Sequence, residues 1–261
     1  MRISLIIPTL NERDGIGYTL DTIHEVQEKE THELFPKETI EWEVLVIDGG
    51  SKDGTQEIAK EKGAKVVEEL RRGYGRAYRT GFALATGDFI ATMDGDGTYP
   101  ASEIPWMIKR LIHTKLDFIS GDRLTLMEKK AMTTEHRIGN WLLNSSMRVL
   151  FHQVLKGVPA KVLTDSQSGM WVFRRSILPS LRLTQDGMPL SEEIKLEVLL
   201  HGFKFEEMPI HYAERWGQPK LSSWHDGLGN LRWLVEKRIQ VSQETRNTPK
   251  LGVPATRPHS P

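Results

Sequence analysis

The sequence predicts an α/β fold in which helices flank a mostly parallel central β-sheet. Apolar, β-branched runs alternate with segments of helical spacing over residues 1–100, which is the pattern of βαβ units. The runs are apolar throughout, as in strands that are buried on both faces. Aspartates follow several of them, and ligands of parallel sheets bind beyond the carboxyl ends of the strands.

Length and composition restrict the class of protein. The chain has 261 residues and a formal net charge of zero, which favours one large domain and argues against a duplex-DNA-binding protein. It has no cysteine, so any metal ligands must be carboxylates, histidines or neutral oxygens. The apolar start is too short for a signal peptide. No apolar run reaches about 18 residues, so we expect no membrane-spanning helix.

The elements of the predicted sheet follow one another along the first part of the chain. Continuous apolar runs predict strands at ISLIIPTL (3–10), WEVLVID (42–48), AKVVEEL (64–70) and DFIATMD (88–94). Helical spacing predicts helices at 15–28 and 53–63, and a glycine-rich loop enters a third at 73–86. Asp53 is expected to cap the second helix and Gly63 to end it.

The stretch TMDGDGTYP follows the fourth predicted strand and holds two aspartates, Asp94 and Asp96. Their side chains share an orientation if the backbone stays extended there. Gly95 and Gly97 let the backbone turn tightly and approach a ligand. Hard oxygen ligands at this spacing suit Mg²⁺ or Mn²⁺, which can in turn bind a diphosphate. A solvated surface turn is the alternative explanation.

Four motifs in order carry a resemblance to a known family. They are IIPTLNE, VLVIDGGSKDGT, GYGRAYRTGFALATGDFIATMDGD and TDSQSGMWVFRR. Together they resemble the family 2 glycosyltransferases, which have the GT-A nucleotide-sugar-binding fold. The likeness covers roughly residues 1–225 and is closest to dolichyl-phosphate mannose synthases and polyprenyl-phosphate glucose synthases. GDR (121–123), EHRIGN (135–140) and ERWGQPKLS (214–222) support this subgroup.

The resemblance implies roles on the donor side. It places Pro8, Leu10 and Glu12 around the nucleotide, Asp48 at the base, Asp94 and Asp96 at the metal and diphosphate, Thr98 as a third metal ligand, and Arg215 and Lys220 near the diphosphate. Thr98 stands where the synthases often have glutamine, which weakens its assignment. The implied cofactor is Mg²⁺ or Mn²⁺, and the implied donor is GDP-mannose or UDP-glucose. Independently, a metal with arginine and lysine would stabilise a leaving diphosphate.

The acceptor side is expected to bind a phosphate. A polyprenyl or dolichyl phosphate is already anionic and needs cations rather than a general base. The resemblance assigns its phosphate to Arg123 and Arg137, whose guanidinium groups suit phosphate oxygens. Asp165 matches a position on the acceptor side, either as a base or as a group that orients the sugar. The pair Glu192 and Glu193 is a further candidate for a base, although it also resembles an ordinary acidic helix start.

Two later segments have broad apolar faces. One spans residues 137–155 and includes Trp141, and the other spans residues 227–241 and includes Trp233. Such faces indicate either core packing or helices that lie on a membrane surface.

The sequence therefore predicts a metal-dependent, inverting hexosyltransferase that acts on a polyprenyl or dolichyl phosphate. We expect it in the cytoplasm, peripherally on the membrane, with a small membrane partner subunit possible and no nucleic acid partner. The predicted regions are a GT-A domain at 1–225, an amphipathic helix at 226–244 and a disordered tail at 245–261. The alternatives are a family 2 enzyme with a soluble hydroxyl acceptor and a non-catalytic nucleotide-sugar-binding subunit.

Overall fold

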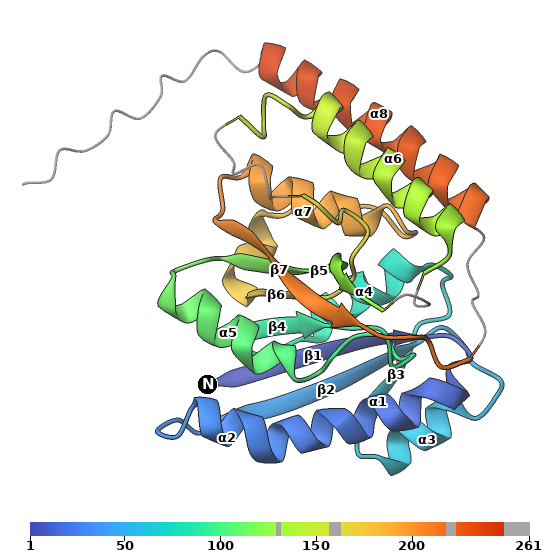
Figure 1. Cartoon of the computed structure of the whole chain (residues 1–261), viewed down its shortest axis with the longest axis vertical. Coiled ribbons are helices and arrows are strands. Elements are labelled where there is room, and N and C mark those ends of the chain that lie inside the picture. The colour runs from blue at the N-terminus through green and yellow to red at the C-terminus, as the bar shows by residue number, and fades with distance from the viewer. Residues whose placement is uncertain (129–131, 157–162, 218–222, 248–261) are drawn as a thin grey trace, which may run out of the picture.

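The computed structural model describes residues 1–128, 132–156, 163–217 and 223–247 (Figure 1). Its strands are β1 (Arg2–Thr9), β2 (Glu41–Asp48), β3 (Lys65–Glu68), β4 (Phe89–Thr92), β5 (Phe118–Met127), β6 (Trp171–Arg174) and β7 (Phe205–Tyr212). Its α-helices are α1 (Arg13–Glu25), α2 (Thr31–Leu34), α3 (Thr55–Glu61), α4 (Tyr74–Leu84), α5 (Glu103–His113), α6 (Thr134–Leu150), α7 (Leu190–Leu200) and α8 (Ser223–Asn247). A π-helical turn at Val26–Glu30 joins α1 to α2, and a 3₁₀ helix at Arg175–Ser180 follows β6.

The seven strands form one sheet in the order β3-β2-β1-β4-β6-β5-β7. All neighbouring pairs are parallel except those of β6, which runs antiparallel to both β4 and β5. The predicted mostly parallel α/β sheet is therefore confirmed. Because β6 runs the other way, the loop that enters it lies beside the carboxyl end of β4, where the aspartate pair follows.

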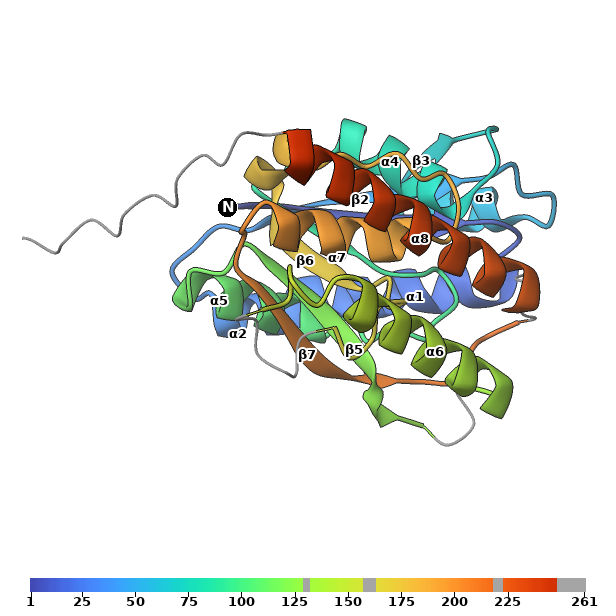
Figure 2. The ribbon, with the colours of Figure 1, turned by 90° about the horizontal axis from the view of Figure 1, so that it is seen from above.

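The central strands are buried on both faces, as their continuous apolar character predicted. In β1, Leu5 packs with Ile3 and Ile7 against helices α1 and α5, while Ile6 points to the opposite face and packs with α4 and α7. This alternation follows from the period of two in a strand. The sheet is thus covered by α1, α3 and α5 on one side and by α4 and α7 on the other (Figures 1 and 2).

Helices α6 and α8 form an outer layer that lies over α7, away from the sheet (Figure 1). Leu143 and Met147 of α6 pack with Trp233 and Leu234 of α8, and Leu196 of α7 joins the same cluster. Each of the two helices therefore buries one of its sides in a third apolar core, separate from the cores on the two faces of the sheet. No helix among the described residues is long and apolar enough to cross a membrane.

Some helices begin or end a few residues away from the predicted position, and the start of α3 is an example. Asp53 was expected to cap α3, but Gly54 occupies the N-cap position, with φ of 97°. The Asp53 carboxylate instead accepts hydrogen bonds from the backbone N–H and the hydroxyl of Thr55 at the first turn. The predicted tail falls largely on residues 248–261, which lie outside the described residues.

Helix α4 packs closely on strand β1, and this contact leads us to predict an effect on the free energy of unfolding. A Cβ atom added at Gly81 would lie 2.4 Å from Cγ2 of Ile6. We expect Gly81→Ala to destabilise the protein by about 1–3 kcal/mol because it overpacks this contact. Gly139→Ala in α6 is the matched control, since a Cβ there has no atom within 4 Å. Urea denaturation should show Gly139→Ala at or above wild-type stability, and equal midpoints for both variants would contradict the prediction.

Candidate active site

The turn after β4 holds the predicted carboxylate pair at the carboxyl end of the sheet. Asp96 is buried, and its Oδ1 accepts hydrogen bonds from the backbone N–H of Thr98 at 3.1 Å and from the Thr98 hydroxyl at 2.7 Å. Gly97 has φ of 77°, a left-handed conformation that favours glycine. Asp94 is half-buried, and the Tyr78 hydroxyl lies 3.4 Å from its Oδ1. The surface-turn alternative does not describe this environment.

The electrostatics of the pair favour a cation. Burial and the neighbouring Asp96 carboxylate raise the pKa of Asp94 to about 7, against the opposing effects of Arg215 and Arg123. A cation bound beside the pair would favour the charged form of Asp94, and hard carboxylate oxygens suit Mg²⁺ or Mn²⁺. The described residues include no cluster of three or more His, Cys, Asp or Glu side chains suited to a metal. A cation bound here would complete its coordination with water or phosphate oxygens.

Arg215 connects the pair to the start of α1. Its Nη2 lies 2.6 Å from Oε1 of Glu12, and its Nη1 lies 3.4 Å from Oδ2 of Asp96. Glu12 is the N-cap residue of α1 and is buried. Three predicted donor-side residues from distant parts of the chain therefore meet in one place. Thr98, expected as a metal ligand, uses its hydroxyl to hold Asp96.

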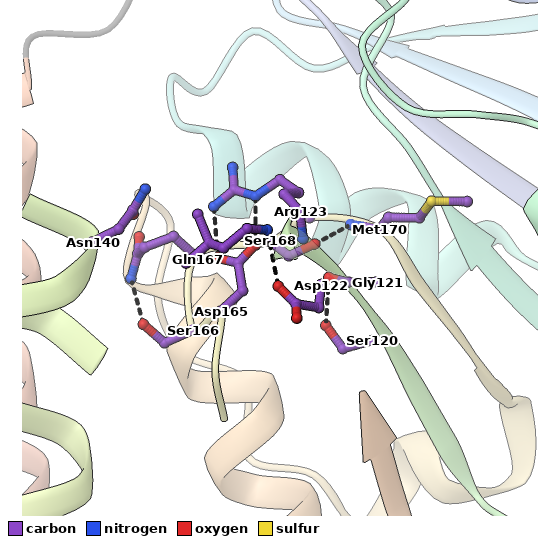
Figure 3. Close-up of polar contacts among 12 residues, drawn as sticks. Ser120, Gly121, Asp122, Arg123, Asn140, Asp165, Ser166, Gln167, Ser168 and Met170 are labelled. Carbon is purple, nitrogen blue, oxygen red and sulfur yellow. Dashed lines mark hydrogen bonds and ion pairs between the residues drawn. The ribbon is translucent and has the colours of Figure 1, made fainter. Parts of the chain in front are cut away.

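Arg123 of β5 and Asp165, from the loop that enters β6, form a buried ion pair (Figure 3). The guanidinium donates from Nε to Oδ2 at 2.7 Å and from Nη2 to Oδ1 at 2.8 Å, and the backbone N–H of Arg123 donates to Oδ2. Burial would raise the pKa of Asp165, but the charge and hydrogen bonds of Arg123 lower it below its ordinary value. This two-point contact fixes the orientation of the arginine side chain.

Asp165 is therefore poorly suited to act as a base. Its side chain has no exposed surface, and both oxygens accept from Arg123. The ammonium of Lys195, also fully buried, donates to the carbonyl oxygen of Asp165. Glu207 of β7 accepts from the backbone N–H and the hydroxyl of Thr164, one residue before Asp165. The geometry favours a positioning role, in which Asp165 holds Arg123.

The other two candidate bases, Glu192 and Glu193, are buried at the start of α7. Glu193 accepts from the backbone N–H groups of Thr184 and Gln185 and from the Thr184 hydroxyl. Glu192 is fully buried, and burial raises its pKa to about 8. Glu193 therefore fixes the residues just before α7, whereas the buried Glu192 carboxylate has no comparable hydrogen bonds among the described residues.

Asp48 ends β2 and is surrounded by donors from its own chain. Its carboxylate accepts from the hydroxyls of Thr9 and Ser51, the backbone N–H groups of Gly50 and Ser51, and the side-chain amide of Gln56. The side chain has no exposed surface. This arrangement suits an aspartate that shapes the loops after β1 and β2. The predicted direct contact with a nucleotide base would need some of these bonds to be exchanged.

The remaining predicted site residues have no hydrogen bond or ion pair with the aspartate pair or with Arg123 among the described residues. Pro8 lies near the end of β1 and is half-buried, and Leu10, just beyond, is 47% exposed. Arg137 lies exposed near the start of α6, and among the described residues no hydrogen bond or ion pair joins its guanidinium to Arg123 or Asp165. Lys220 lies outside the described residues.

Sequence analysis missed several residues that the structure brings to the site. Tyr212 ends β7, and the Arg123 guanidinium lies 5.4 Å from the centre of its ring. Tyr18 and Trp216 stack with ring centroids 5.5 Å apart beside the aspartate turn. The buried Lys195 was the one with a visible signal, because a lysine interrupts the apolar face of SEEIKLEVLL. The tyrosines and the tryptophan have no local pattern that reveals their long-range contacts.

The Arg123–Asp165 pair makes a prediction about stability. Asp165→Asn leaves a buried arginine without its counter-charge, so we expect it to lower the free energy of unfolding by about 3–5 kcal/mol at neutral pH. Folding lowers the pKa of Asp165, so its stabilisation is present above the unfolded pKa and lost as pH falls through the folded pKa. The difference from wild type should therefore shrink in acid.

Glu236→Gln is the control for that experiment. It breaks an ion pair with Arg232 whose side chains are 57% and 81% exposed, and such pairs contribute about 0–1 kcal/mol. Urea denaturation that gives equal losses for the two variants would contradict a special role for the buried pair.

Comparison with known proteins agrees with this geometry. The family model described as "Glycosyl transferase family 2" matches residues 4–182. The low-salt glycan biosynthesis hexosyltransferase Agl6 of Haloferax volcanii is 31% identical over 235 residues, covering 89% of this chain and 53% of that protein. The dolichyl-phosphate hexose transferase of the same organism is 30% identical over 243 residues, covering 92% of this chain and 96% of that protein.

A solved structure supports the fold alone. Glucosyl-3-phosphoglycerate synthase from Mycobacterium tuberculosis, crystallised with Mn²⁺, UDP and glucosyl-3-phosphoglycerate, superposes with a TM-score of 0.66 at 20% identity. The match covers 96% of this chain and 82% of that one. With the sheet order, the family match and the relatives taken together, this chain belongs to glycosyl transferase family 2 and is a glycosyltransferase of the GT-A fold.

Proposed function

We propose that this enzyme transfers a hexose from a nucleoside-diphosphate sugar to a polyprenyl or dolichyl phosphate, with inversion and with the help of Mg²⁺ or Mn²⁺. The observation that carries the proposal is the Arg123–Asp165 ion pair, whose guanidinium is near enough to act on the charge of Asp94. It offers the acceptor a fixed cation, while the carboxylate that could have served as a base is consumed in holding that cation.

The donor side is assigned to the carboxylates and Arg215. Asp94 and Asp96 would hold the cation, which neutralises charge on the leaving diphosphate when it is bound. Arg215 lies between Glu12 and Asp96, where its guanidinium can reach the same phosphates. The M. tuberculosis neighbour was itself crystallised with Mn²⁺ and UDP, which is consistent with this assignment. The choice between GDP-mannose and UDP-glucose is left to the assay below.

The acceptor side is assigned to Arg123, with Arg137 as a second candidate. A phosphate monoester oxygen would attack the anomeric carbon while the bond from that carbon to the diphosphate oxygen breaks, so no proton needs to be removed. Arg123 would orient the acceptor phosphate and Asp165 would hold Arg123. The curated relative that matches over nearly its whole length is named a dolichyl-phosphate hexose transferase, which supports the same acceptor class.

The outer helices support a lipid acceptor. On α6, Ile138, Trp141, Leu142 and Val149 are 56%, 66%, 52% and 73% exposed, and on α8, Leu228, Leu231, Val235 and Ile239 are 68%, 40%, 44% and 53% exposed. At helical spacing, each set lies opposite the side that its helix buries. Because α6 and α8 share one layer, both apolar stripes point away from the core. We propose that this face rests on the membrane surface, in line with the interfacial-helix hypothesis.

The two alternatives have less support. A soluble hydroxyl acceptor would need an accessible base, whereas Asp165, Glu192 and Glu193 are buried. A non-catalytic binding subunit has no need for Asp94, Asp96 and Arg215 to converge.

A transfer assay tests the acceptor and the donor together. Purified protein would be incubated with Mg²⁺ or Mn²⁺, a polyprenyl phosphate, and labelled GDP-mannose or UDP-glucose in parallel reactions. We expect label from one donor to enter the organic phase and chelator to abolish it. Label that stays aqueous with both donors, in a protein that binds donor, would contradict the lipid-phosphate proposal.

Asp96→Ala tests the cation and diphosphate assignment. We expect transfer to fall by at least about a hundredfold, because one ligand to the charged leaving group is lost. Circular dichroism and urea denaturation should show an intact fold. Near-normal turnover in this variant would remove Asp96 from the site.

Vesicle flotation tests the membrane face. We expect the double variant Trp141→Glu/Leu231→Glu to lose binding to anionic vesicles, since each change puts a charge on an exposed apolar stripe. Trp106→Glu is the control, because Trp106 is also exposed, at 52%, but lies on α5. Equal flotation of all three proteins, or loss in the control alone, would argue against this face.

A further inference from the structure

A short segment after β7 holds the guanidinium group of Arg215 against the carboxylates of Glu12 and Asp96. The segment, residues 213–217, follows Tyr212 and passes over the aspartate turn. Its backbone is tied there by two hydrogen bonds, from the N–H of Ala213 to the carbonyl of Thr98 at 3.0 Å and from the N–H of Trp216 to the carbonyl of Asp96 at 2.9 Å.

Aromatic packing holds the same segment from the other side. The Trp216 ring stacks on Tyr18 of α1. Both rings also cover Gly97, since a Cβ there would lie 2.7 Å from Cδ1 of Trp216 and 3.1 Å from Cδ1 of Tyr18. The segment is thus clamped between α1 and the aspartate turn, and Arg215 stands in the middle of the clamp.

Arg215 is placed where a divalent cation would compete with it. Its guanidinium bridges Glu12, at 2.6 Å from Oε1, and Asp96, at 3.4 Å from Oδ2. Its Nε is buried and has no acceptor among the described residues. One N–H of this arginine, in its present position, is therefore without a hydrogen bond to the described part of the chain. A second cation on Asp96 would repel the guanidinium that now lies 3.4 Å from that carboxylate.

We propose that Arg215 is the resident counter-cation of the carboxylate pair and that a divalent metal replaces it. Arg215 then keeps affinity for the metal alone low. A bound diphosphate gives the displaced guanidinium a new anionic partner, so metal and diphosphate favour each other's binding, as linkage requires. This inference rests on the proposed metal site at Asp94 and Asp96 and adds a regulation of it.

The test measures Mn²⁺ binding to the chelator-treated full chain, without nucleotide, by electron paramagnetic resonance of free Mn²⁺. We expect Arg215→Gln to bind Mn²⁺ about tenfold more tightly than wild type, because a competing charge a few ångströms away has been removed. Arg215→Lys keeps the charge and should stay near wild type. Arg110→Gln, which breaks the distant ion pair with Glu206, controls for the change in net charge.

Tyr18→Ala provides a second variant in case Arg215→Gln does not fold. It loosens the clamp without changing any charge, and Tyr18 is 49% exposed. We expect it to tighten Mn²⁺ binding in the same direction by a smaller factor. If Arg215→Gln folds and binds Mn²⁺ no more tightly than wild type, the inference is overturned. If Arg215→Gln does not fold, the same result in Tyr18→Ala overturns it.

Asp96→Asn distinguishes a failure of this inference from a failure of the proposed metal site at Asp94 and Asp96. If Asp96→Asn removes Mn²⁺ binding and Arg215→Gln does not strengthen it, the metal site stands and the role of Arg215 is wrong. If no protein shows binding that depends on Asp96, both the metal assignment and the inference are overturned.

Discussion

The buried ion pair between Arg123 and Asp165 is the interaction on which the site depends. An unpaired charge at this depth would be costly, so each partner requires the other. The pair joins β5 to the loop that enters β6, and β6 is the strand that reverses direction in the sheet. Lys195 from α7 and Glu207 from β7 complete the surroundings of that loop. The loop that holds Arg123 is thus itself fixed by contacts from α7 and β7.

A second set of charges organises the donor side in the same manner. Asp94 and Asp96 come from the turn after β4, Glu12 from the start of α1 and Arg215 from the segment after β7. Burial and the neighbouring carboxylate of Asp96 together raise the pKa of Asp94. The two clusters are near enough for Arg123 to act on Asp94. Leaving group and acceptor phosphate, in the proposed reaction, therefore enter one electrostatic environment.

Local patterns in the sequence predicted the sheet and the aspartate turn well. Continuous apolar strands and glycines beside aspartates are properties of neighbouring residues, so no knowledge of the fold is needed to see them. The partners of these residues could not be predicted in that way. Glu12 and Arg215 meet across 203 positions of the chain, and the clamp of Trp216 on Tyr18 depends on the same long-range closure. For Asp165, the sequence left a base and an orienting group open, and only its contact with Arg123 distinguishes them.

For the outer helices α6 and α8, the sequence pattern alone could not tell core packing from membrane contact. Helix α6 is apolar on two opposite sides, with Leu143 and Met147 inside and Trp141 and Val149 outside. A pattern of this kind satisfies both core packing and membrane contact, so the sequence could not choose between them. The structure shows that α8 covers one side, and the other is left exposed.

The central claim is that Asp94 and Asp96 hold a divalent cation together with the donor diphosphate. Its most direct test is a crystal of the protein grown with Mn²⁺ and UDP or GDP, examined by anomalous scattering at the manganese edge. We expect a manganese peak in contact with Asp96 or Asp94 and with the diphosphate oxygens. A nucleotide bound in the site with no manganese peak at either aspartate would contradict it.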